Sequence, residues 1–311
     1  MLTEARHAVD LVRYRASKAR HEREDRAALR GLEQVPVRLP AGLEIEWLGV
    51  AGYRLSYEGH TLLLDPFLSR FPLRDLLLRR TVLPDPARVA ALDAPGTVVG
   101  IACGHAHWDH CLDTPALVRR FGCAAYGSRS LANLMRLHGL GEQAVEAVPH
   151  HRYELGPFEL SFTPSVHSKL VFGRSVPMAG DTAATSLDQL TAQAYRCGQT
   201  WGIRVAVGGL VIYHQGSADL IDDEVRDHDV DLFLAGIAGR NFTPDYWRRI
   251  LPLLRPKVVV PMHYDDFFAP VEDEPITFLP QTHLASVAAE IAAVNPAVTV
   301  AALPRLAPIG G

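Results

Sequence analysis

Three histidines and one aspartate fall within six consecutive positions of the chain: His105, His107, Asp109 and His110. Neutral imidazole and carboxylate groups are the ligands that zinc and other borderline divalent cations prefer. On an extended loop, His105 and His107 point the same way, whereas Asp109 and His110 serve a neighbouring position. The spacing therefore predicts a site for one or two metal ions, with zinc expected and manganese or iron as alternatives.

The element that precedes these residues explains how they would be held in place. Residues 97–103 form an apolar stretch that predicts a buried strand, and a short loop at a strand end commonly carries the chemistry of a fold. Similar stretches begin at residue 44, first as hairpins and later alternating with helical segments, which predicts a mixed α/β protein. Strands are predicted at residues 44–48, 53–57, 60–65, 97–103, 124–126, 143–148, 158–162, 203–207, 210–213, 231–234, 258–260 and 298–302, and helices at 115–121, 128–138, 244–254 and 283–294.

Residues 4–30 are predicted to form one helix that ends at Gly31, because small apolar residues recur there at spacings of three and four. The first interpretation is a helix packed on the surface of the main domain. A dimer arm or a lid stays open, whereas a membrane-surface helix would need larger apolar residues. We predict an N-terminal helical extension (1–40), through which a homo-oligomer could form, followed by one domain (41–311). The apolar residues are Ala5, Val9, Val12, Ala16 and Ala19.

Composition limits the classes of protein to which the chain can belong. The 311 residues include 31 Lys and Arg against 35 Asp and Glu, and this acidic balance disfavours binding to nucleic acid. Four cysteines without a CxxC pair are too few for a disulfide scaffold and indicate a reducing compartment. The first residues lack the apolar core of a secretory signal, and no apolar run approaches the roughly 20 residues that cross a bilayer. We expect a cytoplasmic protein that acts on a small-molecule substrate.

The histidine-rich segment resembles the HxHxDH motif of the metallo-β-lactamase superfamily, and the resemblance extends over residues 44–265. Asp65, followed by a proline, comes after the first predicted strands, as in that superfamily. His167 follows a strand some tens of residues beyond the motif, and His263 follows a late apolar strand. The chain is most similar to the branch that contains ascorbate-6-phosphate lactonase and the N-acyl-phosphatidylethanolamine phospholipases D.

This resemblance implies a fold, an activity and a set of ligands. The fold is an αββα four-layer sandwich, with two mixed sheets face to face and helices outside. The activity is metal-dependent hydrolysis, in which an activated water attacks an ester, lactone or phosphodiester. Asp65 would orient the ligand loop, and the catalytic Asp109 would hold the water and accept its proton. One metal would be bound by His105, His107 and His167, and a second by Asp109, His110 and His263.

One position departs from the superfamily pattern. After a strand and a glycine, where a carboxylate usually bridges the two metals, this chain has Ser217. A neutral hydroxyl has no charge to offset the repulsion between two dications. Three interpretations stay open: Asp219 supplies the carboxylate, the site binds one metal firmly and a second weakly, or Asp181 in a Gly-Asp-Thr sequence is the bridge.

Other functions are compatible with the same ligands, because fold and metals alone do not choose the reaction. A metal-dependent oxidoreductase on this fold would bind iron. A non-catalytic binding module with a partly decayed site would explain the missing carboxylate. A nuclease of the RNA-processing type is disfavoured by the acidic balance of the chain. We predict a hydrolase.

Overall fold

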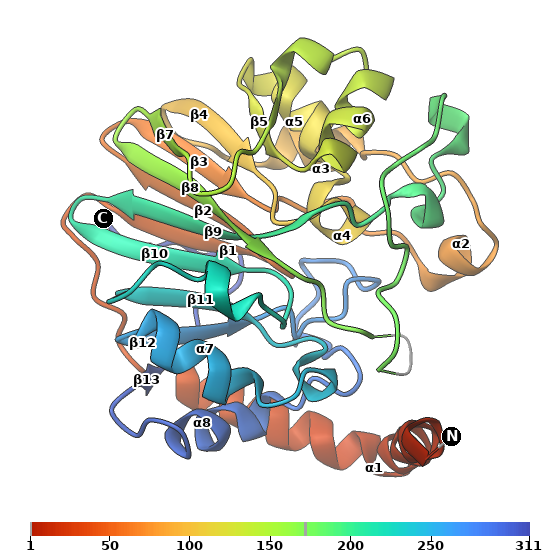
Figure 1. The fold of residues 1–311 in the computed structure, drawn as a ribbon, viewed down its shortest axis with the longest axis vertical. Helices are drawn as coiled ribbons and strands as arrows, with labels where there is room; N and C mark the ends of the chain where they lie inside the picture. The colour runs from red at the N-terminus through yellow and green to blue at the C-terminus, as the bar shows by residue number, and fades with distance from the viewer. Residues whose placement is uncertain (1, 171–172) are drawn as a thin grey trace.

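Two seven-stranded sheets face each other in the computed structural model, which describes residues 2–170 and 173–311, with side chains from Ser17 onward in the first helix (Figure 1). The first sheet has the order β14-β1-β2-β3-β4-β5-β6. Its strands are β1 (Glu44–Gly49), β2 (Gly52–Tyr57), β3 (His60–Leu64), β4 (Thr97–Ala102), β5 (Ala125–Gly127), β6 (Ala144–Glu146) and β14 (Ile309–Gly310).

The second sheet has the order β13-β12-β11-β10-β9-β8-β7. Both sheets are mixed, because an antiparallel hairpin region continues into parallel strands in each of them. The αββα sandwich predicted from the sequence is therefore confirmed. The strands are β7 (Arg152–Leu155), β8 (Phe158–Ser165), β9 (Thr200–Val207), β10 (Leu210–Gln215), β11 (Leu232–Gly236), β12 (Val258–Met262) and β13 (Thr299–Val300).

Helices cover the outer faces of the two sheets. In Figure 1, α3, α5 and α6 lie beside the first sheet at the top, whereas α1, α7 and α8 lie at the opposite side of the molecule. Among the described residues, none of the helices has the length and the hydropathy required to cross a membrane. The helices are α1 (Leu2–Leu32), α2 (Leu73–Leu77), α3 (Pro86–Ala91), α4 (Trp108–Cys111), α5 (Thr114–Phe121), α6 (Arg129–Leu137), α7 (Tyr246–Leu254) and α8 (Leu284–Ala292).

The core lies between the two sheets, where apolar side chains from both inner faces are excluded from water. Leu62 and Leu64 of the first sheet, and Ile203 and Leu234 of the second, are fully buried. Burial of one such side chain contributes about 1.5–3 kcal/mol. This core fixes the strand ends, and the loops that leave those ends carry the candidate ligands.

The first helix runs two residues past its predicted end at residue 30. Gly31 does not stop α1, because Leu29 and Leu32 on either side of it are buried and the Leu32 carbonyl accepts a hydrogen bond from the Ala302 amide at 3.0 Å. The tertiary contacts thus outweigh the roughly 1 kcal/mol that glycine costs within a helix. Most of the predicted apolar stripe, Ala5, Val9, Val12 and Ala16, lies outside the described side chains.

The second half of α1 packs against α8. The Asp25 carboxylate accepts a hydrogen bond from the Ala285 amide in the first turn of α8, at 2.8 Å, and the rings of His21 and His283 lie 4.7 Å apart. These contacts support the interpretation of a helix packed on the main domain. The division into residues 1–40 and 41–311, and an oligomer formed through this helix, stay predictions.

Candidate metal centre

All six predicted ligands are buried and lie at one edge of the sandwich. His105 and His107 follow β4, whereas His167 follows β8 and His263 follows β12. The prediction of an extended loop is wrong for the second half of the motif, because Asp109 and His110 lie on the short helix α4. The ligand atoms fall into two groups, within each of which they lie no more than 4.8 Å apart: His105, His107 and His167, and Asp109, His110 and His263.

Hydrogen bonds fix which ring nitrogen carries the proton in three of these histidines. His107 donates from Nε2 to the Pro177 carbonyl at 2.9 Å, and His167 donates from Nδ1 to the Ser168 carbonyl at 2.7 Å. His110 donates from Nδ1 to the Asp65 carboxylate at 2.7 Å. In the neutral form of each ring the opposite nitrogen carries a lone pair, which is the form that binds a metal.

Several buried nitrogens of the cluster have no hydrogen-bond partner in the described part of the chain. They are both ring nitrogens of His105, Nε2 of His110 and Nδ1 of His263. A buried polar atom without a partner costs about 1–3 kcal/mol unless another group satisfies it. Together with the donor set of imidazoles and one carboxylate, these orphaned atoms fit a divalent cation such as zinc.

The protonation states favour metal binding. Burial lowers the pKa of His105 far below its usual value, that of His107 to about 4 and that of His167 to about 3, so these rings are neutral at pH 7. Burial opposes the ionisation of Asp109, but the neighbouring His110 and His263 outweigh it and hold the pKa of the carboxyl well below its usual range. Nε2 of His263 lies 3.3 Å from Oδ2 of Asp109.

Asp65 lies at the end of β3 and contacts the loop that carries the candidate ligands. Its side chain is fully buried, and its carboxylate accepts hydrogen bonds from the Gly104 amide at 2.6 Å and from His110 at 2.7 Å. Its own amide donates to the Ala102 carbonyl at 2.9 Å, which joins the ends of β3 and β4. The structure therefore places Asp65 behind the ligands, where a residue that orients metal histidines is commonly found.

Ser217 at the bridging position and the two aspartates considered as the bridging carboxylate lie in different places. Ser217 faces the candidate ligands in the cavity, and its hydroxyl accepts a hydrogen bond from the Ser168 amide at 3.1 Å. The Asp219 carboxylate is held by Arg249 at 3.2 Å and by the Leu220 amide at 2.9 Å. Asp181 is exposed. Neither aspartate lies within the two ligand groups.

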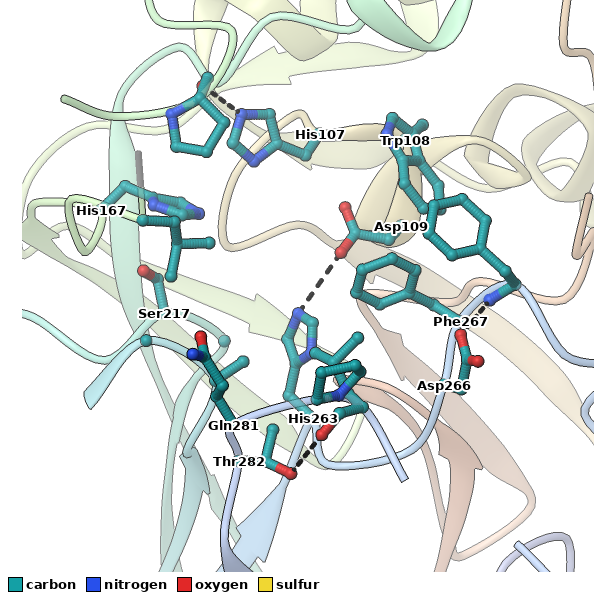
Figure 2. Close-up of a pocket in the computed structure, with 18 of the residues that line it drawn as sticks. His107, Trp108, Asp109, His167, Ser217, His263, Asp266, Phe267, Gln281 and Thr282 are labelled. Carbon is teal, nitrogen blue, oxygen red and sulfur yellow. Dashed lines mark hydrogen bonds and ion pairs between the residues drawn. The ribbon is translucent and has the colours of Figure 1, made fainter. Parts of the chain in front are cut away.

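The candidate ligands open into a cavity of about 570 Å³ (Figure 2). Asp109 and His263 lie between His167 on one side and Trp108 and Phe267 on the other. This volume is within the range of small-molecule sites. Residues of several loops line the cavity besides the ligands, among them Leu73, Leu76, Leu170, Met178, Ser217, Phe242, Phe267, Phe268 and Gln281.

A buried arginine holds the loop that borders this cavity. Arg240 follows β11 and donates hydrogen bonds to the carbonyls of Thr282 and His283. It also donates from Nε and Nη2 to the Glu290 carboxylate on α8, at 2.8 and 2.9 Å, and Trp247 Nε1 donates to the same carboxylate at 2.8 Å. The loop that contains Thr282 is thereby tied to α7 and α8.

We expect the substitution Glu290→Gln to lower the free energy of unfolding by about 1–3 kcal/mol at pH 7, because hydrogen bonds to a charged group are lost. Although burial raises the pKa of Glu290, hydrogen bonds from Arg240 outweigh it and lower the pKa from 4.5 to about 2. A lowered pKa stabilises the fold above pH 4.5, and this contribution is lost as the pH falls towards 2.

Urea denaturation of wild type and variant at pH 7 and pH 3 tests this expectation. The difference between the two proteins should be smaller at pH 3, whereas Glu142→Gln, at an exposed site, should cause little change at either pH. A difference that stays constant with pH would contradict the role assigned to the ionised carboxylate.

Comparison with known proteins assigns the family. A family model described as "Beta-lactamase superfamily domain" matches residues 44–263, so the chain belongs to this superfamily, as the motif predicted. The chain is 29% identical to a "UPF0173 metal-dependent hydrolase" of Carboxydothermus hydrogenoformans, over 72% of this chain and 85% of that protein. It is 27% identical to one of Lysinibacillus sphaericus, over 76% of this chain and 91% of that protein.

A solved structure shows the same fold. Igni18, a metallo hydrolase from Ignicoccus hospitalis, superposes with a TM-score of 0.51 at 20% identity, covering 86% of this chain and 97% of its own. At this identity the likeness concerns the fold alone. The narrower resemblance to the branch of ascorbate-6-phosphate lactonase stays a prediction.

Sequence reasoning missed most residues of the cavity lining. Phe267 and Phe268 come directly after the acidic residues that follow His263. Two aromatic residues so close to a candidate ligand could have indicated a wall of the cavity. Asp113 was also missed: this buried carboxylate accepts hydrogen bonds from the amides of Leu68 and Ser69, at 2.6 and 2.9 Å. It thereby fixes the loop that follows β3.

Proposed function

We propose that this protein is a metal-dependent hydrolase that acts on a small-molecule substrate in the cavity above the candidate ligands. The observation that carries the proposal is the burial of six ligand side chains, with unpartnered nitrogens, at the inner end of that cavity. A closed structural site would leave no room for a substrate, whereas this one opens to about 570 Å³. The names of the relatives, metal-dependent hydrolases, agree with it.

We assign some of these residues to metal binding and others to proton transfer. A divalent cation bound by these side chains, for which we propose zinc, would supply the Lewis acidity that acidifies water and polarises the substrate oxygen. Asp109 is ionised and buried, so its carboxylate can orient the attacking water and accept its proton. His263, 3.3 Å from that carboxylate, orients Asp109. Asp65 holds His110 in the tautomer that leaves Nε2 free.

We further propose that the site binds one metal firmly and a second weakly. Asp109 is the one carboxylate in the two ligand groups, and the bridging position holds the neutral Ser217. Arg249 engages Asp219, and a hydrogen bond from the Leu220 amide holds the same oxygen, so moving Asp219 into the site would break both contacts. Two dications would therefore repel each other with little negative charge between them.

The substitution Ser217→Asp is expected to raise the affinity for the second metal about tenfold or more, because it places a carboxylate beside both ligand groups. Mass spectrometry and a zinc titration measure occupancy directly. Ser217→Asn is the matched control, since it has the size of aspartate without the charge and should leave the stoichiometry unchanged. Equal stoichiometry in wild type and Ser217→Asp would refute uneven binding.

The proposed function is tested by metal analysis and turnover of one preparation. Protein purified without added metal is analysed for bound ions and then assayed with an ester, a lactone and a phosphodiester. We expect zinc in the preparation, hydrolysis of at least one substrate, loss of activity with a chelator and recovery with zinc. Bound iron would favour an oxidoreductase. Protein that binds no metal even when zinc is supplied would refute the proposal.

A further inference from the structure

One side of the cavity is an aromatic wall made of Trp108, Phe267 and Phe268, with Phe71 behind them. The ring centroid of Trp108 lies 4.7 Å from that of Phe71, 5.1 Å from that of Phe267 and 5.5 Å from that of Phe268. Phe267 also contacts the candidate ligand His263, at 5.9 Å between centroids. The apolar surface of the wall therefore extends to the candidate ligands Asp109 and His263 (Figure 2).

The apolar lining continues from the aromatic wall to the solvent. Leu76 and Met178 line the cavity, and Leu73 and Leu170 line it while 47% and 36% exposed. Apolar side chains left in contact with water at the opening of a cavity gain when an apolar ligand covers them. The cavity thus offers a path for a long apolar group from the ligands to the surface.

Polar groups of the lining are largely engaged within the protein. Thr282 donates its hydroxyl hydrogen to the Leu279 carbonyl at 2.8 Å, and Asn241 donates to the Gln281 carbonyl at 3.2 Å. The Asp266 carboxylate accepts the Phe268 amide at 2.9 Å. The lining donors not used in these contacts, such as the Gln281 side-chain amide and the Ser217 hydroxyl, are uncharged.

The charges of the lining are negative. Among the described residues that line the cavity, Asp109 and Asp266 carry carboxylates and no lysine or arginine is present. An anionic group is commonly recognised by arginine, lysine or a helix N-terminus, and a buried anion without such a partner is costly. A phosphate in this cavity would meet two carboxylates and gain only what a bound metal provides.

We propose, resting on the hydrolase function, that the substrate is an uncharged carboxylic ester or lactone with a long apolar acyl group. Water adds to the carbonyl carbon, the ester C–O bond breaks, and the released oxygen takes a proton of the water. The products are a carboxylic acid and a free alcohol from an ester, or one hydroxy acid from a lactone, so no further reactant is required. Each methylene buried along the aromatic wall raises kcat/KM about fourfold until the cavity is filled.

The first experiment measures binding, which does not depend on turnover. Acetamide, butanamide, hexanamide, octanamide and dimethyl phosphate are titrated against the zinc-loaded protein by calorimetry. Affinity should rise about fourfold per methylene along the amides, and dimethyl phosphate should bind more weakly than octanamide. Affinity that is independent of chain length, or preference for the phosphate, overturns the proposal.

The second experiment measures kcat/KM for p-nitrophenyl esters of the same chain lengths and for bis(p-nitrophenyl) phosphate. A rise with acyl length, and turnover of the phosphodiester at least about 100-fold lower, support the proposal. Chain-length-dependent binding of the amides without hydrolysis of any ester would refute the hydrolase function and leave the assigned ligand class intact. The two failures are thus distinguishable.

Phe267→Ala tests the aromatic wall. Phe267 is only half-buried, so the variant should fold, and it should bind octanamide about tenfold more weakly while binding acetamide almost as wild type does. Phe121→Ala is the matched control, because Phe121 is also half-buried but stands at the end of α5, outside the cavity lining. If Phe267→Ala and Phe121→Ala weakened octanamide binding equally, the aromatic wall would not be the binding surface for the apolar chain.

Discussion

Replacing Asp109 with alanine is expected to lower kcat/KM by about 10³-fold or more while leaving the fold largely intact. Two functions are lost with this carboxylate: it is a candidate metal ligand, and it is the group placed to accept a proton from the attacking water. General-base catalysis alone typically contributes 10²–10⁴-fold. The residue is buried and its carboxyl has a strongly lowered pKa, so the base is ionised throughout the neutral range.

The matched control is Asp181→Ala. Asp181 is an aspartate of the literal Gly-Asp-Thr sequence that was considered for the bridge, and it is exposed. Circular dichroism, metal content and kcat/KM are measured for both variants. We expect native-like spectra in both and a loss of activity only in Asp109→Ala. Wild-type turnover by Asp109→Ala, or a comparable loss in Asp181→Ala, would show that the roles are assigned to the wrong carboxylate.

The candidate ligands could be located from sequence because they lie on the loops, and on the short helix α4, that follow strands, and the strands are short apolar stretches. His105 follows β4 and His263 follows β12 within three residues, so correct prediction of the strands also placed the ligands at one edge of the sandwich. The resemblance to a known motif supplied the grouping into two sets, which spacing alone left open. The structure brings these same sets together.

The rest of the site could not be predicted, because it depends on loops whose paths are set by distant contacts. Thr282 reaches the cavity because Arg240, 42 positions earlier, binds its carbonyl. Leu73 and Met178 both line the cavity although they lie far apart in sequence and neither belongs to a regular pattern of apolar residues. No local propensity encodes such contacts, so the cavity lining had to be read from the structure.

Errors in the fold prediction have a similar cause. Strand β7 was missed because its residues Arg152–Leu155 are partly exposed and contain charged residues, so pairing with β8 rather than hydrophobic pattern defines it. Strand β14 has two residues and exists only through its pairing with β1. Gly31 stops α1 in isolation but not against the buried Leu32. In each case tertiary contacts override the local preference.

The second large effect is expected from Asp65→Asn, a change of one atom in a fully buried side chain. The carboxylate accepts from both the Gly104 amide and Nδ1 of His110, and an amide can offer only one oxygen to these two donors. Turning its NH₂ group towards His110 makes Nδ1 an acceptor and moves the ring proton to Nε2. The nitrogen that faces the other ligands then has no lone pair for a metal.

We therefore expect Asp65→Asn to weaken metal binding by about 10–100-fold, with the larger loss in the group of Asp109, His110 and His263. Nitrogen-15 NMR of the histidines reports the tautomer of His110, and a zinc titration reports the affinity. The matched control is Asp113→Asn, another fully buried carboxylate with amide donors, which should lower stability but retain the metal. If both variants lost the metal equally, Asp65 would act through general stability, and orientation of His110 would not be its role.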